Sequence, residues 1–416
     1  MHKTILYIIA VLIATSCNQS SESNIDLTST PIDSLSASCP VATTDDHGNF
    51  VLSWVRRNQD STLNLCYAVS NGDVFDKTIV IPGTQKIHPH NENLPKLIFK
   101  PSGEIIAIWG ASNPNPKNKY SGLVYYAQSF DDGKTWTSPK SLVKDIASFD
   151  QRYFDVALLP DGEAGVVWLD NRKTINGEGS GLYFARSVGR SGFQDEKLIA
   201  QPTCQCCRTD LFIDENKNFH VLYRGIINDS IRDMQHIVST DNGSNFSAPK
   251  LISDDNWVIY GCPHTGPSMT SSNNNLHFAW YTGGIQRGSF YNTSRDNGNT
   301  FSARQHISAQ GMHPQMTTLA NGNVAIVWDE PAVHSQPQEL SHTTVHNAAH
   351  ATATSYNKKI GFQIRSAQGQ LIENKYLTGE GIDASYPVIT SSNGKTMVAF
   401  IVKENNSSYV HTMMIR

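Results

Sequence analysis

The sequence lacks a strong excess of charge of either sign. Its formal net charge is -4, and acidic and basic residues are interspersed along the chain. Proteins that bind nucleic acid or an anionic membrane surface usually carry a basic patch or stripe. The composition therefore argues against a nucleic-acid partner.

Two other kinds of segment are missing. After the N-terminus, no apolar run is long enough to span a membrane as a helix. No long stretch shows the helical period either; short segments of alternating apolar residues recur instead, separated by Gly, Asn and Asp. This pattern predicts an all-β chain.

The N-terminus has the pattern of a signal peptide. A short cationic start precedes an apolar run over residues 5–14, and small residues precede Cys17. This ending resembles a bacterial lipoprotein signal, which predicts lipidation of Cys17 and export to the cell envelope, with a membrane anchor. A plain secretory signal is the alternative. The polar, Ser-rich residues 18–36 are expected to form a tether, part of which could close the folded domain.

A repeat extends through residues 37–416. One unit reads "LPKLIFKPSGEIIAIW" followed by "LVYYAQSFDDGKTWTSPKSL", which is typical of four strands joined by Gly-containing turns. Seven such units recur about every 55 residues, a spacing that fits four-stranded blades around a channel. The sequence thus predicts a β-propeller with seven blades. The tryptophans that end the second strands are expected to pack between blades: Trp54, Trp109, Trp168, Trp280 and Trp328.

The turn between the third and fourth strands carries a specific motif. The segments "SFDDGKTW" (129–136), "STDNGSNF" (239–246) and "SRDNGNTF" (294–301) match the Asp-box pattern S-x-D-x-G-x-[ST]-[WF] closely. The Asp can bond backbone amides of its own turn, and the Gly can adopt a positive φ. On these motifs the chain resembles the sialidase-like, BNR or Asp-box repeat propellers. Because sialidases have six blades, the resemblance keeps six as the alternative to seven.

Seven cysteines occur in the whole chain, and three of them lie in "PTCQCCRTDLF" (202–212). This segment directly precedes the innermost strand of the fourth unit, and "YGCPHTGPS" and "GMHPQM" take the same place in the fifth and sixth. In a propeller these loops meet at one mouth of the channel, on the face opposite the Asp-boxes. We therefore expect one cluster there, composed of Cys204, Cys206, Cys207, Cys262, His264, Met312 and His313.

Thiolate, imidazole and thioether ligands together favour copper or zinc, so this cluster predicts a site for a thiophilic metal. One or two disulfides, or a redox-active thiol pair, are the alternatives, since exported cysteines tend to pair. A His-rich insertion at residues 331–357 is expected on the same face. It contains His342, His346 and His350, which one face of a short helix would present together.

The resemblance to sialidases also implies a possible glycosidase site. Sialidases bind the substrate carboxylate with three arginines, use a Tyr activated by a Glu as nucleophile, and use an Asp as acid or base. Leu94 stands where their Arg-Ile-Pro motif would offer its arginine, which argues against sialic-acid hydrolysis. The residues that could serve a glycosidase are Tyr386, Glu330, Asp170, Arg152, Arg208 and Arg224.

Three hypotheses follow for the function. The first is an envelope lipoprotein that binds copper or zinc for metal handling or redox work. The second is an exo-glycosidase acting on terminal anionic sugars. The third is a non-catalytic propeller that binds a glycan or another envelope protein.

Overall fold

The computed structural model describes residues 31–114, 121–144, 150–172, 179–332 and 357–415. These residues form 28 β-strands and one short 3-10 helix, η1 (Gly189–Ser191). Within them, no helix has the length and apolar character needed to cross a bilayer.

The strands form seven antiparallel sheets in chain order. The first three blades contain β1 (Ala37–Thr44), β2 (Phe50–Arg57), β3 (Leu63–Asn71), β4 (Val74–Phe75) and β5 (Ile79–Val80); β6 (Lys96–Phe99), β7 (Ile105–Ser112), β8 (Gly122–Ser129) and β9 (Lys140–Ser141); β10 (Gln151–Leu158), β11 (Ala164–Asp170), β12 (Ser180–Ser187) and β13 (Phe193–Thr203).

The fourth and fifth blades contain β14 (Asp210–Ile213), β15 (Phe219–Arg224), β16 (Met234–Ser239) and β17 (Lys250–Leu251); β18 (Ser268–Ser272), β19 (Asn275–Thr282), β20 (Gly288–Ser294) and β21 (Gln305–Ser308). The last two contain β22 (Met312–Thr318), β23 (Val324–Pro331), β24 (Lys358–Arg365) and β25 (Leu371–Tyr376); β26 (Ala384–Ser392), β27 (Lys395–Glu404) and β28 (Ser407–Ile415).

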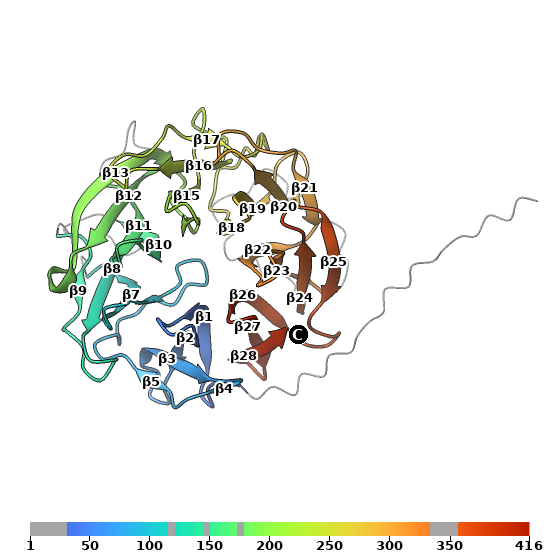
Figure 1. The fold of residues 1–416 in the computed structure, drawn as a ribbon. Coiled ribbons are helices and arrows are strands. Elements are labelled where there is room, and N and C mark those ends of the chain that lie inside the picture. The colour runs from blue at the N-terminus through green and yellow to red at the C-terminus, as the bar shows by residue number, and fades with distance from the viewer. Residues whose placement is uncertain (1–30, 115–120, 145–149, 173–178, 333–356, 416) are drawn as a thin grey trace, which may run out of the picture.

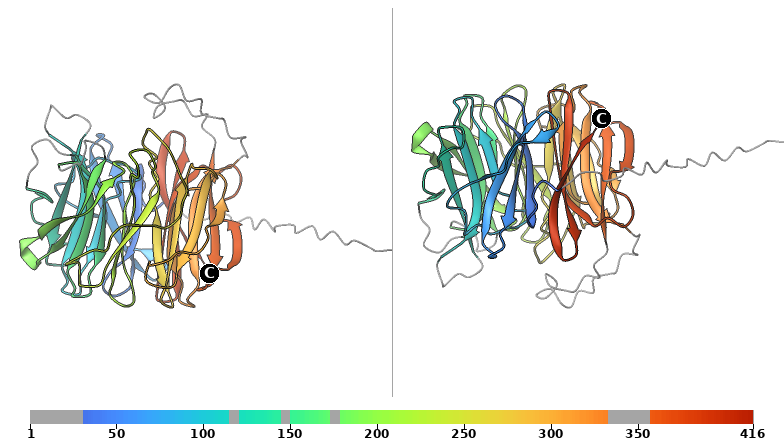
Figure 2. Two further views of the ribbon diagram at one scale, coloured as in Figure 1. Left: turned by 90° about the horizontal axis from the view of Figure 1, so that it is seen from above. Right: turned by 90° about the horizontal axis from the view of Figure 1, so that it is seen from below.

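The blades stand in a ring, with the first and last side by side and the innermost strands around the centre (Figures 1 and 2). The prediction of an all-β propeller with seven blades is therefore confirmed, and the six-bladed alternative is wrong. A cavity of about 760 Å³ lies along the axis, lined by inner strands of six blades. It reaches the β1–β2 and β6–β7 turns, on the face that carries the Asp-boxes.

Neighbouring blades pack through apolar side chains, because both faces of most strands are buried. The five tryptophans of the second strands are at most 2% exposed and belong to the apolar clusters that join adjacent blades. Four of their indole N–H groups also donate to a carboxylate. The pairs are Trp54 with Asp33 (2.8 Å), Trp168 with Asp170 (3.4 Å), Trp280 with Asp255 (2.7 Å) and Trp328 with Glu330 (2.7 Å).

The three Asp-box turns share one set of hydrogen bonds. In the second box, the Gly243 amide donates to Ser239 Oγ (2.9 Å) and the Asn245 amide donates to Asp241 Oδ1 (2.8 Å). Gly243 has φ +78°, which a residue with a Cβ would adopt only with strain. Equivalent bonds of 2.8 and 2.9 Å occur in the other two boxes.

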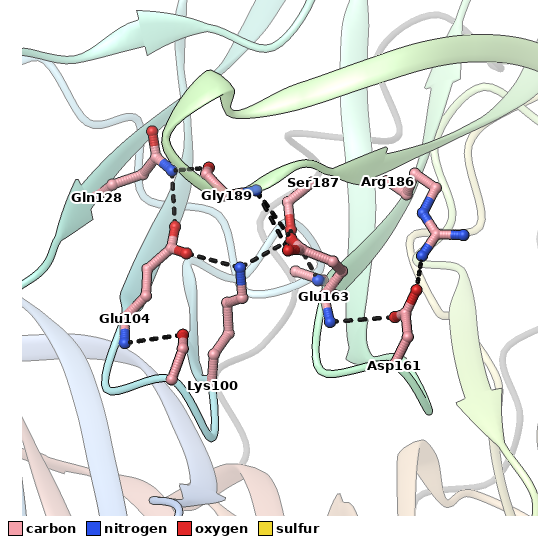
Figure 3. Close-up of polar contacts among 10 residues, drawn as sticks. Lys100, Glu104, Gln128, Asp161, Glu163, Arg186, Ser187 and Gly189 are labelled. Carbon is pink, nitrogen blue, oxygen red and sulfur yellow. Dashed lines mark hydrogen bonds and ion pairs between the residues drawn. The ribbon is translucent and has the colours of Figure 1, made fainter.

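A buried polar network ties the second blade to the third (Figure 3). Lys100 Nζ donates to Glu104 (2.6 Å) in its own blade and to Glu163 (2.8 Å) in the next. Gln128 donates to Glu104 (2.7 Å) and to the Gly189 carbonyl (2.9 Å). Because these charges are paired and hydrogen-bonded, they can be buried at the blade interface.

The ring closes at the seam between the last blade and the first. The seventh blade has three strands among the described residues, and the Ile32 amide donates to the Val410 carbonyl of β28 (3.0 Å). Asp33 then accepts from Trp54 (2.8 Å) and Arg56 (2.6 Å) of the first blade. The segment before β1 thus bridges the two blades, although it forms no strand of its own.

Candidate functional site

The starts of four innermost strands, and the loop before a fifth, share an unusual backbone conformation. Five residues other than glycine have a left-handed φ there, between 47 and 54°; they are Cys39, Tyr153, His264, His313 and Tyr386. Next to four of them the pairing with the second strand shifts register. Such strained residues persist where the surrounding structure holds them, and they cluster at functional sites. Five blades therefore each hold one residue in this conformation at the same end of the channel.

The three clustered thiols lie together and are buried. Cys204 Sγ is 3.6 Å from Cys206 Sγ and 4.0 Å from Cys207 Sγ, and the three sulfurs lie within 4.8 Å of one another. All six cysteines of the described residues are free. Three sulfurs around one ion with metal–sulfur bonds of about 2.3 Å would be roughly 3.8 to 4.0 Å apart. The spacing of these thiols fits a shared soft metal ion.

The thiols influence one another's protonation. Burial raises the pKa of the Cys207 thiol, but contacts with Cys204 and Cys206 and the positive charge of Arg224 outweigh it and hold that pKa well below its usual value. Contacts with Cys204, Cys207 and Cys262, together with burial, raise the pKa of Cys206. The cluster therefore stabilises one thiolate among buried thiols.

Cys262 extends this group toward solvent. Its side chain is exposed, and interactions with the Cys206 thiol and the His264 imidazole lower its pKa to about 5. His264 Nδ1 lies 3.5 Å from the Tyr153 hydroxyl. The sequence-predicted residues Cys204, Cys206, Cys207, Cys262 and His264 thus form one continuous group.

His90 faces His264, with ring centroids 5.3 Å apart. Its Nδ1 accepts the Glu92 amide N–H (3.1 Å), which leaves the proton of the neutral ring on Nε2. Burial lowers the pKa of His90 to about 4, and the neighbouring imidazoles contribute, so the ring is neutral near pH 7. His90 is therefore a hydrogen-bond donor at the mouth.

His313 belongs to a second group, on the sixth and seventh blades. Its Nδ1 lies 3.1 Å from both oxygens of Asp329, which directs the Nε2 lone pair away from the carboxylate. The Tyr386 ring packs on His313 with centroids 4.4 Å apart. Asp329 also accepts from the Tyr386 amide (2.8 Å) and Lys358 Nζ (3.2 Å). An oriented imidazole of this kind can accept a proton or bind a metal ion.

The two groups are joined beneath by a buried ion pair. Arg208 donates to Glu92 (2.9 Å) and to the backbone carbonyls of Gly266, Pro267 and Pro314 (3.1 to 3.2 Å). Glu92 also accepts the Gly266 amide (2.6 Å). The pair fixes the loops of four blades relative to one another.

Met312, which the sequence assigns to the metal cluster, pairs with Asp329 through its backbone at the start of β22. No described contact joins its thioether to the sulfurs. Cys17, His342, His346 and His350 lie outside the described residues.

The other residues proposed for a glycosidase each have partners of their own among the described contacts. Glu330 is held by Trp328 and by the Tyr376 hydroxyl (2.6 Å), and Asp170 is buried beside Arg172. Arg152 pairs with Asp150. Arg208 is held as described above, and Arg224 donates to the carbonyls of Arg232, Thr265 and Tyr281.

Sequence reasoning missed Asp329, Lys358 and Glu92. Asp329 directly precedes Glu330 in "WDEP", and neighbouring strand residues point to opposite sides. The sequence therefore shows the motif, but it does not show which of the two carboxylates contacts Tyr386.

No protein-family model and no curated protein sequence matches this chain. Solved structures do. The BP39L lectin from Burkholderia pseudomallei matches over 91% of this chain and 96% of its own, with 8% identity and a TM-score of 0.60. The polysaccharide lyase Uly1 matches over 95% and 93%, with 10% identity and a TM-score of 0.56. The Hadza microbial sialidase Hz136 matches over 85% and 73%, with 13% identity and a TM-score of 0.48.

The lectin and the lyase match over nearly their whole length, so this chain shares the β-propeller fold with them. The three Asp-box turns form as the sequence predicts. At such low identities the likeness concerns the fold, which hosts many functions.

Proposed function

We propose that the protein binds a thiophilic metal ion, copper or zinc, at the mouth of its channel. The observation that carries this proposal is the cluster of three buried, unbridged sulfurs within 4.8 Å of one another. Soft thiolate ligands select Cu(I) and zinc over harder ions. Metal handling or redox work in the cell envelope would use such a site.

Cu(I) suits the inner cluster better than zinc. Structural zinc sites are almost always four-coordinate, whereas the buried cluster offers three sulfurs. A four-coordinate zinc site would need a fourth ligand, which Cys262 or His264 would have to supply. Arg224 favours the binding of either ion. Its side chain is buried, and its Nε–H has no hydrogen-bond partner among the described residues. Its positive charge stabilises the negatively charged thiolate that binds the ion.

Elemental analysis tests the proposal. Residues 18–416, purified without oxygen and supplied with Cu(I) or Zn(II), should retain one ion per chain. A Cys204→Ser, Cys206→Ser, Cys207→Ser variant should retain none, while Cys66→Ala, which changes a buried thiol of the first blade, should behave as the wild type. Equal metal content in the triple variant and the wild type would refute the proposal.

We further propose that the chain is exported and lipid-anchored through Cys17. The support is the N-terminal pattern alone. Expression in a bacterial host with a labelled fatty acid should give a labelled protein in the membrane fraction. Cys17→Ala should remove the label, and a wild-type chain without label would contradict the anchor.

A second candidate function is the binding or cleavage of an anionic glycan, and another envelope protein could take the same surface. The observation that favours it is the group of Asp329, His313, Lys358 and Tyr386 at the mouth, which offers an oriented base, a cation and a phenol. The fold is shared with a lectin and a polysaccharide lyase.

Calorimetric titration with sialic acid and glucuronic acid, together with turnover of a fluorogenic sialoside, tests this candidate. Tyr386→Phe should weaken binding or turnover, and Tyr376→Phe, which loses a bond to Glu330, should not. Equal responses of both variants and the wild type would exclude a role for Tyr386.

A further inference from the structure

The four thiols of the mouth differ in their access to solvent. Cys262 is exposed, whereas Cys204, Cys206 and Cys207 are each at most 3% exposed. A metal ion delivered from outside therefore reaches Cys262 before it can reach the inner three sulfurs.

The thiols also follow one another in space. Cys262 interacts with Cys206, Cys206 lies 3.6 Å from Cys204, and Cys204 lies 4.0 Å from Cys207. The three inner sulfurs are thus near enough for one ion to contact two of them at once, and Cys262 is next to Cys206 on the solvent side. The two ends of this series come from different blades, since Cys262 precedes β18 and the other three precede β14.

We propose that Cys262 is the acceptor thiol that takes Cu(I) from a soluble Cu(I)–thiolate donor and passes it through Cys206 to the buried cluster. This inference rests on the proposed metal site and adds its donor class and its route of loading. Cys262 is the sulfur that a donor complex can touch, because burial closes direct access to the others.

The transfer needs no oxidant or reductant. Cys262 forms a Cu–S bond while one donor thiolate leaves, and any proton displaced from Cys262 passes to that thiolate. Cys206 then forms a Cu–S bond as the Cys262 bond breaks, and its proton returns to Cys262. The ion remains Cu(I), and each step makes one Cu–S bond and breaks one.

His264 and His90 flank the route at the mouth. The His264 Nδ1 lies 3.5 Å from the Tyr153 hydroxyl, and the His90 ring lies 5.3 Å from the His264 ring. Cys262 itself is exposed, so a small donor complex can approach it.

Stopped-flow loading with the Cu(I)–glutathione complex, under nitrogen, separates the rate of transfer from the affinity. Copper–thiolate absorbance reports the rate, and competition with a coloured Cu(I) chelator reports the affinity. Access of the attacking sulfur controls such exchange, so Cys262→Ser should load at least about tenfold more slowly than the wild type. Its affinity should stay within about threefold, because the inner ligands remain.

Two further variants calibrate the result. Cys206→Ser should lose affinity itself, and Cys66→Ala should match the wild type in both measurements. Circular dichroism and thermal unfolding verify that each variant is folded.

Equal loading rates for Cys262→Ser and the wild type would overturn the inference. So would a loss of affinity in Cys262→Ser as large as in Cys206→Ser, because Cys262 would then be a permanent ligand. If the wild type takes up no Cu(I) from any donor, the metal site itself fails, which is a different outcome.

Discussion

Cys262 differs from the other described cysteines in being exposed and in having a pKa near 5, which the Cys206 thiol and the His264 imidazole lower. The thiolate is the nucleophile, so its alkylation rate should be almost independent of pH from 8 down to about 6 and should fall to about half near pH 5. Peptide mass spectrometry after iodoacetamide pulses would measure this. Cys66, whose pKa burial raises to about 12, is the unreactive control. A rate that already falls below about pH 8 would indicate an ordinary thiol.

Asp329 supports a second prediction. Burial alone would raise its pKa, but His313 and Lys358 hold the pKa well below its usual value. Because folding lowers the pKa of Asp329, its carboxylate stabilises the folded state at pH values above the unfolded-state pKa of about 4. This stabilisation is lost as the pH falls toward the lower pKa of the folded state. Asp329→Asn should therefore lower the free energy of unfolding by about 3 kcal/mol at pH 7.

The difference between Asp329→Asn and the wild type should shrink below pH 4. Urea unfolding at pH 7 and at pH 3.5 would measure it. An equal difference at both values would show that the carboxylate charge is not what stabilises this region.

The sequence predicted the grouping of the thiols, because the position of each loop within a repeated unit fixes the end of the channel where it lies. It could not place Met312, His313 and Asp329 relative to one another. The register shift between Met312 and Gln315 changes which side chains face the mouth, and nothing in the local residue pattern marks it.

At the scale of the strand, a bond between tryptophan and carboxylate recurs in four blades, but the sequence separation of the two residues is not constant. Asp33 precedes its tryptophan by 21 residues and Asp255 by 25, whereas Asp170 and Glu330 follow theirs by two. The blade pattern and the Asp-boxes were predictable because they have a constant spacing. These carboxylates were not, since two blades supply the acceptor from the strand of the tryptophan and two supply it from a segment far earlier in the chain.

The contribution of these carboxylates to stability can be tested at Asp255. It is 1% exposed and accepts from Trp280 Nε1 (2.7 Å), Ser253 Oγ (2.7 Å) and Arg304. Asp255→Ala leaves these donors without an acceptor and should cost about 3 kcal/mol of stability in urea unfolding. The neighbouring Asp254 is exposed, so Asp254→Ala should change stability by less than about 0.5 kcal/mol. Similar losses in both variants would refute a special role for the buried acceptor.

At the scale of the whole molecule, the seam between the first and last blades depends on a few residues. Ile32 contributes a backbone hydrogen bond and apolar contact, and Asp33 holds Trp54 and Arg56. A chain that starts at residue 37 should therefore be about 2–4 kcal/mol less stable than one that starts at residue 31. Thermal and urea unfolding of the two chains would measure the difference, with Asp33→Ala expected to reproduce part of it. Equal stabilities would show that β1 and β28 close the ring unaided.

The place of this seam also determines how the molecule can be oriented. The described chain begins beside β28, the outermost strand of the seventh blade, and so at the rim of the ring (Figure 1). An attachment through the preceding residues would join the propeller at its rim, away from either end of the channel. Both ends of the channel would then stay open to the surroundings, one presenting thiols and imidazoles and the other the Asp-box turns.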